Sequence, residues 1–473
     1  MTAIVTSKFR TLNAENFKDD INTPVSGSSV FVAIGKTDAW SYAVSDTTDA
    51  EPFTPSDTID NLVEARENIF ALKKLNTADV SHVVPRHTWT TGTSYVEWDS
   101  NDPDMFDKAF YVITSEFKVY KVIYSPGTGS TQEPTQTLTA PTAESDSYIW
   151  KYMYTVAVAD AEKFLTTSYM PVKTINVESF ADDATAEAAL SEGDYAQYLN
   201  QKASRDSTTA AGIERIELVN ADGNETATSG TGYTSAPNVY ITGAGTGATA
   251  TPTISAGAVT AIAVTAKGTD YSTAHIVISG GGGSDATARA VISPENGHGT
   301  DPVKELGGFF SAVNTLLDGS GGGDLTVGND FRQITLVKNP FNFGTATVST
   351  AATLKATPAL SFSSTTSSFS VDELITQGSG ATLAQAFVVE VDAGTGYVYY
   401  LQNSKTGYGN FVTGSAVVGA TSGAQGTPKA AAGDFLINPE VDVHSGDVIF
   451  LENRNPIDRT ASQIEDIKII IEF

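Results

Sequence analysis

An internal repeat in the middle of the chain constrains the fold more than any other feature of the sequence. Gly230-Thr231-Gly232-Tyr233 leads into one run of β-branched residues, and Lys267-Gly268-Thr269-Asp270-Tyr271 leads into a second, similar run. Glycine turns between short β-branched segments predict strands, and self-similarity at a fixed spacing predicts a module built from the repeat. We therefore expect residues 205–294 to form a Gly/Thr-rich β module.

The two repeated tyrosines, Tyr233 and Tyr271, each follow a glycine turn. We expect them to fill the core of this small module. The rival interpretation is a phosphate-binding glycine loop, but such a loop opens a helix. Threonines and a further strand follow here, which favours the structural interpretation.

A weaker repeat predicts a second inserted β module over residues 345–432. Residues 387–391 and 397–401 are both β-rich, and the turn Asp392-Ala393-Gly394-Thr395-Gly396 separates them. A short glycine-containing loop between two such runs is typical of a hairpin.

The remaining segments have a different residue pattern, which predicts a core that contains both helices and strands. Helical spacing of apolar residues is clearest over residues 59–75, followed by residues 184–199. Strands are expected at residues 110–113, 117–124, 447–451 and 467–473. We expect an α+β, mainly β protein with a discontinuous core (1–204, 295–344 and 433–473) that carries the two inserted modules.

Composition excludes several classes of function. The chain has 473 residues, with 28 Lys and Arg against 55 Asp and Glu, and a net charge of −27. Binding to a nucleic-acid duplex needs clustered cations, so we expect no nucleic-acid partner. The absence of cysteine excludes disulfides, thiolate metal sites and a cysteine nucleophile. No apolar run approaches a membrane-spanning length, so we expect no membrane partner.

Residues that carry chemistry are sparse. The nearest approach to a site is His298 beside Asp301 on a glycine-flanked turn, as a metal ligand or a base. A turn in which Asp301 caps the next segment and His298 hydrogen-bonds locally is the preferred interpretation. The acidic turn of Asp99, Asp102 and Asp104 lacks the glycine and closing glutamate of a calcium loop, which favours a solvated turn. We expect no enzyme activity and no catalytic residue, cofactor or metal.

Five segments resemble a known family, in the same order along the chain. They are 3–11 (AIVTSKFRT), 84–89 (VPRHTW), 146–152 (DSYIWKY), 331–340 (FRQITLVKNP) and 444–457 (HSGDVIFLENRNPI). Together they resemble the baseplate wedge proteins of T-even-type contractile-tailed bacteriophages, the gene-product-eight family. The resemblance covers roughly 1–200, 295–343 and 433–473, and the two inserted modules depart from it.

This resemblance implies a structural protein of the virion tail baseplate, assembled in the host cytoplasm. It implies a layered β-sandwich core and a homodimer in each wedge. The dimer would bridge wedge scaffold proteins to the peripheral proteins that carry the tail fibres, and would move as a rigid body on contraction. Candidate interface residues within the family-like segments are Arg86, Trp89, Trp150, Arg332 and Arg454. Each of them is equally compatible with a core position or an intrachain salt bridge.

A different function would assign the inserted modules to host glycans. Exposed Tyr233, Tyr271 and Tyr408 would then stack on sugar rings. This alternative ranks below the wedge component, and an enzyme acting through His298 and Asp301 ranks third.

Overall fold

The computed structural model describes residues 3–22, 27–41, 48–206, 211–220, 228–318, 330–430, 435–458 and 464–473. The chain divides into two compact units. Unit 1 comprises Met1–Glu15, Ser81–Ala312 and Ile470–Phe473, and unit 2 comprises Asn16–Val80 and Val313–Ile469. Helix α1 (Ser7–Asn22) and strands β17 (Phe310–Asp318) and β30 (Ile464–Glu472) contain points at which the chain passes from one unit to the other.

Unit 1 contains an antiparallel sheet in the order β4-β5-β7-β6. Its strands are β4 (Tyr111–Ile113), β5 (Lys118–Tyr124), β6 (Thr142–Ala143) and β7 (Ile149–Thr155). Strand β3 (Val80–Pro85) pairs with β8 (Tyr169–Val172) in the sheet β30-β17-β3-β8. The helices are α3 (Val158–Phe164), α4 (Asp183–Ala189), α5 (Glu192–Arg205) and α6 (Pro302–Leu306), with single 3₁₀ turns at Met105–Asp107 and Val177–Ser179. Aromatic and β-branched side chains on β4, β5 and β7 form the core.

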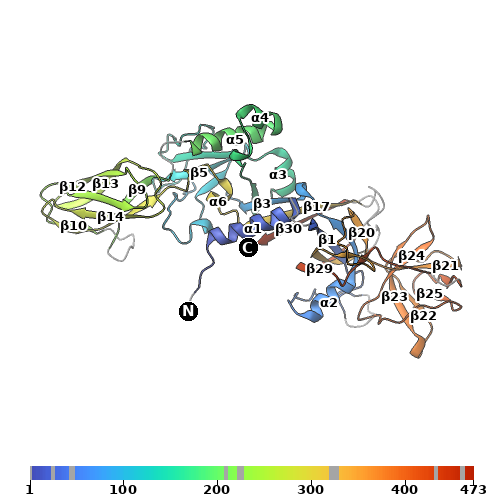
Figure 1. The fold of residues 1–473 in the computed structure, drawn as a ribbon. Helices are drawn as coiled ribbons and strands as arrows, with labels where there is room; N and C mark the ends of the chain where they lie inside the picture. The colour runs from blue at the N-terminus through green and yellow to red at the C-terminus, as the bar shows by residue number, and fades with distance from the viewer. Residues whose placement is uncertain are drawn as a thin grey trace. The chain divides into compact units, whose positions relative to one another are not determined.

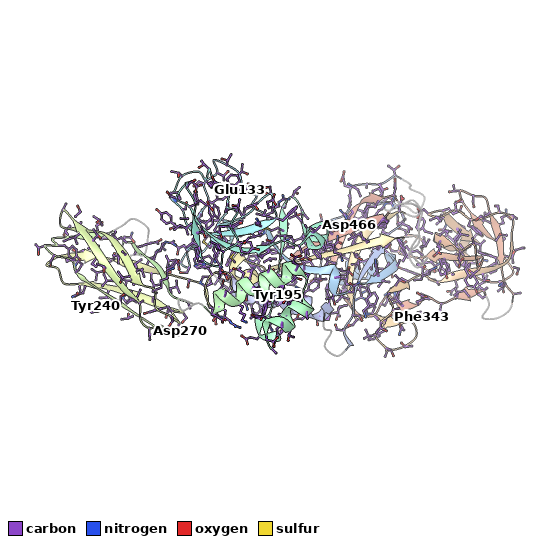
Figure 2. All side chains as sticks on the ribbon, turned by 90° about the horizontal axis from the view of Figure 1, so that it is seen from above. Glu133, Tyr195, Tyr240, Asp270, Phe343 and Asp466 are labelled. Atoms are coloured by element: carbon purple, nitrogen blue, oxygen red, sulfur yellow. The ribbon has the colours of Figure 1, made fainter. Side chains whose placement is uncertain are left out.

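The first repeat region folds as a β module, as expected. Its strands are β9 (Ile213–Leu218), β10 (Ser229–Thr231), β11 (Asn238–Gly243), β12 (Thr249–Ser255), β13 (Ala258–Ala266), β14 (Ala274–Ser279), β15 (Ser284–Ala286) and β16 (Ala288–Ile292). They form the sheets β12-β13-β9-β16, β11-β14 and β10-β15 (Figure 1). Tyr240 and Asp270 lie on the outside of this module (Figure 2).

The repeat is visible in the atomic contacts around the two tyrosines. Tyr233 and Tyr271 are 5% and 4% exposed and lie in one apolar cluster, which confirms their predicted core role. Gly230 and Gly268 both have φ +67°, and a Cβ on either would lie 2.8 Å from the ring of its own repeat's tyrosine. A Cβ on Gly283 would lie 2.5 Å from the Tyr233 ring, and a Cβ on Gly245 would lie 2.5 Å from the Tyr271 ring. Each tyrosine ring therefore packs closely against a glycine of its own repeat and a glycine of the other repeat.

Unit 2 is built around the antiparallel sheet β20-β2-β1-β18-β29. The strands are β1 (Val30–Gly35), β2 (Ile69–Lys74), β18 (Phe331–Lys338), β20 (Thr353–Lys355) and β29 (Asp447–Ile457), and helix α2 (Ile59–Asn68) precedes β2. A short pair, β19 (Phe341–Asn342) with β28 (Val441–Asp442), and a 3₁₀ turn at Thr77–Asp79 complete this part. Strands from the two ends of the chain thus flank β18, one on each side.

The second repeat region forms a sheet in the order β24-β23-β22-β25-β26-β21-β27, and an extra pairing of β21 with β24 closes it on itself. Its strands are β21 (Ala359–Thr365), β22 (Leu374–Gln377), β23 (Ala384–Val391), β24 (Tyr397–Leu401), β25 (Val417–Gly419), β26 (Gln425–Pro428) and β27 (Leu436–Ile437), with a 3₁₀ turn at Gly380–Thr382. The expected hairpin is β23–β24. Closure removes most unpaired strand edges.

The predicted α+β, mainly β class is confirmed. The division into one core and two inserted modules remains a prediction, and its boundary at 432/433 lies outside the described residues. Within the described residues, no helix combines the length and apolarity needed to cross a bilayer.

Two helix predictions need correction. The expected helix over residues 59–75 ends at Asn68, and Ile69–Lys74 is strand β2 between β1 and β20. Ile69 and Phe70 favour strand, and burial between two neighbouring strands overrides the helical spacing. The expected helix over residues 184–199 is two helices, because Ser191 caps α5 by accepting a hydrogen bond from the backbone N–H of Asp194.

Candidate functional site

The expected turn at His298 and Asp301 is confirmed for Asp301. This residue caps α6, where its carboxylate accepts from the backbone N–H of Lys304 at 3.2 Å and from the Thr174 hydroxyl at 2.6 Å. The local hydrogen bonds expected for His298 are absent among the described residues, since neither of its buried ring nitrogens has a hydrogen-bond partner there. Burial, together with nearby cations, lowers the pKa of His298 well below its usual value, so the ring is neutral.

His298 belongs to a buried charge cluster, which we define as Lys121, Lys151, His298 and Glu305. Lys121 is 0% exposed, and its Nζ lies 3.0 Å from Glu305 Oε2 and 3.9 Å from the centre of the Trp98 ring. The other carboxylate oxygen of Glu305 accepts from the backbone N–H groups of Gly299 and Asp301, at 2.8 and 3.1 Å. One cation and two backbone donors therefore engage the two oxygens of this carboxylate.

Lys151 supplies the second buried cation of the cluster. Its Nζ donates to the Thr139 carbonyl at 2.5 Å, to Asn200 Oδ1 at 3.2 Å and to Ser204 Oγ at 3.0 Å. Burial lowers the pKa of Lys151 to about 8. These contacts join β7 to α5, so that the cluster ties sheet and helix together.

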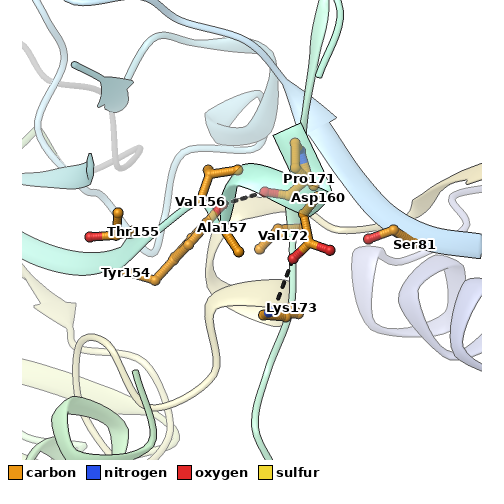
Figure 3. A pocket seen from close by; sticks show the side chains of 9 residues that line it. All are labelled: Ser81, Tyr154, Thr155, Val156, Ala157, Asp160, Pro171, Val172 and Lys173. Atoms are coloured by element: carbon orange, nitrogen blue, oxygen red, sulfur yellow. Dashed lines mark hydrogen bonds and ion pairs between the residues drawn. The ribbon is translucent and has the colours of Figure 1, made fainter. Parts of the chain in front are cut away.

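The side chains of the buried charge cluster have no access to a substrate. A general acid or base must reach the substrate proton within hydrogen-bond distance, and the side chains of the buried charge cluster are enclosed by protein. A nearby hollow between β7, α3 and β8, lined by Tyr154, Asp160 and Lys173 among others, measures about 10 Å³ (Figure 3). That is room for about one water molecule. Among the described residues, no three His, Asp or Glu side chains converge as metal ligands.

Two of the predicted interface residues have intrachain roles. Trp150 is 0% exposed, stacks on Tyr148 at 5.4 Å and meets Tyr95 edge-on at 5.7 Å. Arg332 on β18 makes a two-pronged ion pair with Asp49, at 2.7 and 2.8 Å, and also donates to the Thr37 carbonyl. Both residues take part in packing within the chain, and their role at an interface remains a prediction.

The other three predicted interface residues retain accessible surface. Arg86 donates to the Thr166 carbonyl at 2.9 Å and is half-buried. Trp89 is half-buried too, and its indole N–H donates to Ser130 Oγ at 3.2 Å. The side chain of Arg454, on the sheet-edge strand β29, is 41% exposed and lies 3.3 Å from Glu452. We infer that a partner has the most direct access to Arg454.

The acidic turn is solvated only in part: Asp104 is exposed, as the sequence suggested, whereas Asp99 is buried. Asp99 is 8% exposed and accepts from Arg289 of β16 at 2.6 Å. Asn101 donates to the Ala290 carbonyl at 2.9 Å, and the Trp98 indole donates to the Ile292 carbonyl at 3.2 Å. This turn therefore holds the first β module through contacts with β16. The sequence does not show that role, because β16 lies far from the turn along the chain.

A further feature is an apolar surface at the start of the chain. Ile4, Val5, Phe9 and Leu12 are between 49% and 84% exposed, and the last two lie on α1. Phe9 and Leu12 are three residues apart and therefore lie on one face of α1, whereas Ile4 and Val5 precede the helix. The apolar residues are visible in the sequence. The segment is short, however, and nothing within it shows whether these side chains face the core or a partner.

Comparison with known proteins bears on the same part of the chain. Residues 3–106 match the family model described as Bacteriophage T4, Gp8. The baseplate wedge protein gp8 of Enterobacteria phage T4 is 28% identical over 133 residues, which is 27% of this chain and 39% of the relative.

The resemblance to the gp8 family is confirmed. The chain spans 39% of the length of the curated gp8 protein that it matches. Arg86 and Trp89 fall within the residues that the gp8 family model matches, as does the apolar surface on α1. Arg332, Arg454 and both β modules lie outside those residues.

Proposed function

We propose that this chain is a structural component of the phage tail baseplate wedge. The observation that carries the proposal is the similarity of its N-terminal part to gp8, which in phage T4 is named a baseplate wedge protein. The buried charge cluster and the small hollow beside it support a role in packing rather than in catalysis.

The finer proposal is that two copies form a homodimer that bridges other baseplate wedge proteins to the tail-fibre attachment proteins. Permanent assemblies bury apolar surface, and Ile4, Val5, Phe9 and Leu12 supply such surface within the gp8-like part. Arg86 and Arg454 supply accessible cations on a strongly acidic protein. On contraction of the tail, the chain would move as a rigid unit.

Dimerisation is tested by native mass spectrometry of the full chain. Phe9→Asp should convert the dimer into a monomer, and Arg86→Ala with Arg454→Ala should weaken it. Arg205→Ala is the matched control, because Arg205 is also an accessible arginine with an intrachain carboxylate partner. A dimer that survives all three interface substitutions would refute the role of these residues in the interface.

Location is tested by electron microscopy of tailed particles labelled with antibodies against residues 228–294. Label in a ring at the distal end of the tail supports the wedge proposal. Label along the fibres contradicts it.

A further inference from the structure

A second, larger pocket lies within unit 2, where helix α2 meets the closed β module. It measures about 170 Å³, where roughly 10–15 Å³ on the same scale is enough for one water molecule. Ile69, Ala356 and Leu401 form apolar lining, and all three are buried. The pocket therefore has the size for one small molecule.

One wall of the pocket is an aromatic ring that is already held in place. Tyr408 is 58% exposed, and its hydroxyl donates to Glu67 Oε2. Burial of the hydroxyl, together with this carboxylate, raises the pKa of Tyr408, so the phenol stays protonated and keeps donating. A fixed, accessible ring face is what a flat apolar surface of a ligand needs for stacking.

Hydrogen-bond acceptors lie beside this ring. The Gln402 amide donates to the Gln385 carbonyl at 3.0 Å and to the Gly409 carbonyl at 2.8 Å. Both of its N–H groups are thus used, which fixes the amide and leaves its oxygen as an acceptor at the pocket. Glu67 contributes carboxylate oxygens, and His444 contributes an exposed imidazole.

The charge of the lining selects among ligand classes. Glu67 is an anion, and among the described residues that line the pocket there is no lysine or arginine. Arg66, beside the pocket, donates to the carbonyls of Val443, Ser445 and Gly446, so a phosphate or a carboxylate would meet Glu67 without a cation in the lining itself. A neutral molecule with several hydroxyl donors is favoured, because hydroxyls donate well to carboxylate and amide oxygens.

We propose that this pocket binds one neutral pyranose ring of a glycan. The C–H face of the sugar stacks on Tyr408, and its hydroxyls donate to Glu67 and Gln402. Tyr233 and Tyr271 take no part, since their burial contradicts the expectation that they are exposed for stacking. The inference concerns a binding activity and does not depend on the wedge proposal.

The pocket also joins two parts of the chain with different relationships to known proteins. Glu67 lies within the residues that match the gp8 family model, whereas Gln402 and Tyr408 belong to the closed β module outside them. The site is thus complete only with the module present, so that sugar binding would be a property of chains that carry it.

Saturation-transfer difference NMR of the full chain tests the proposal. The probes are glucose, galactose and N-acetylglucosamine, with glucuronate and inorganic phosphate as anionic comparisons. We expect at least one neutral sugar to bind at millimolar concentration and the anions not to bind. Tyr408→Ala should weaken binding by about tenfold through loss of the stacking surface. Tyr408→Phe retains the ring and should lose less.

Tyr240→Ala is the matched control, because Tyr240 is a similarly exposed tyrosine (53%) on the other β module. It should leave sugar binding unchanged. The proposal is overturned if no neutral sugar gives a signal, if the anions bind as well as the neutral sugars, or if Tyr240→Ala and Tyr408→Ala have equal effects. Native mass spectrometry of the same variants keeps any loss of dimerisation separate from loss of sugar binding.

Discussion

Removal of one charge from the buried pair Lys121–Glu305 should destabilise unit 1 strongly. Both side chains are almost fully buried and their charged atoms are 3.0 Å apart. At that distance and an effective dielectric constant of about 20, their attraction is about 5.5 kcal/mol. In Lys121→Met the carboxylate of Glu305 keeps only its two backbone donors and the field of Lys151. We expect a loss of about 3–5 kcal/mol in the free energy of unfolding, as for other buried pairs broken on one side.

The double variant Lys121→Met with Glu305→Gln separates this explanation from simple loss of packing. Glutamine keeps an oxygen for the N–H groups of Gly299 and Asp301 but carries no charge, so most of the lost stability should return. Lys304→Met is the control. Lys304 pairs with Asp301 at 2.9 Å, but its side chain is 61% exposed, and a pair of that kind contributes only about 0–1 kcal/mol.

Urea unfolding at pH 7, followed by tryptophan fluorescence, measures these differences, because Trp98 lies directly against Lys121. The reasoning is refuted if Lys121→Met costs less than about 1 kcal/mol, well below the loss expected for an uncompensated buried charge. It is also refuted if the cost of the double variant equals the sum of the two single costs.

Three further predictions concern stability. Gly230→Ala and Gly268→Ala should lower the free energy of unfolding by similar amounts, and by more than the roughly 1–2 kcal/mol expected for Gly257→Ala at a left-handed position. The reason is that, of these three glycines, only Gly230 and Gly268 have backbone atoms within 2.6 Å of an added Cβ. Hydrogen exchange of β11 and β14 measures the loss, and unequal losses for the two variants would contradict the equivalence of the two repeats. Burial lowers the pKa of Lys151 to about 8, so the native chain releases this proton at a lower pH than the unfolded chain, and stability should rise between about pH 8 and 10.5. Lys151→Met should reduce that rise in thermal unfolding, and the rest comes from Lys36 and Lys121, whose pKa values burial also lowers. Burial raises the pKa of Asp372 to about 7, so the folded chain keeps this proton up to a higher pH than the unfolded chain does. The free energy of unfolding should therefore fall as the pH rises from about 4 to 7. Asp372→Asn, which tolerates the local φ of 63°, should remove that fall, and an unchanged pH profile would contradict the assignment.

Local patterns were the predictable part of this fold. The glycine turns before Tyr233 and Tyr271 predicted both the strands and the buried rings, because the signal lies within each repeat. The hairpin β23–β24 followed from its turn in the same way. The strand at Ile69–Lys74 was missed, because its pairing with β1 and β20 depends on segments far away in the chain.

The buried charge cluster was beyond sequence reasoning for a similar reason. Lys121, Lys151 and Glu305 come from three separate elements, and nothing near any of them marks it as buried. His298 stood out only as a histidine on a glycine turn. The pocket beside Tyr408 likewise combines α2, β2, β24 and three loops, so that only its exposed tyrosine was visible in advance.

The way each β module is joined to the rest of the chain has an evolutionary consequence. In the first module the opening strand β9 pairs with the closing strand β16, with Ile213 opposite Ile292. In the second, β21 pairs with β27, with Ala359 opposite Ile437. Opposite residues on paired strands have Cα atoms only about 5 Å apart. The two ends of each module are therefore as close together as the two ends of a tight turn. A lineage can therefore acquire, exchange or lose such a module in one genetic step while the surrounding sheets keep their register.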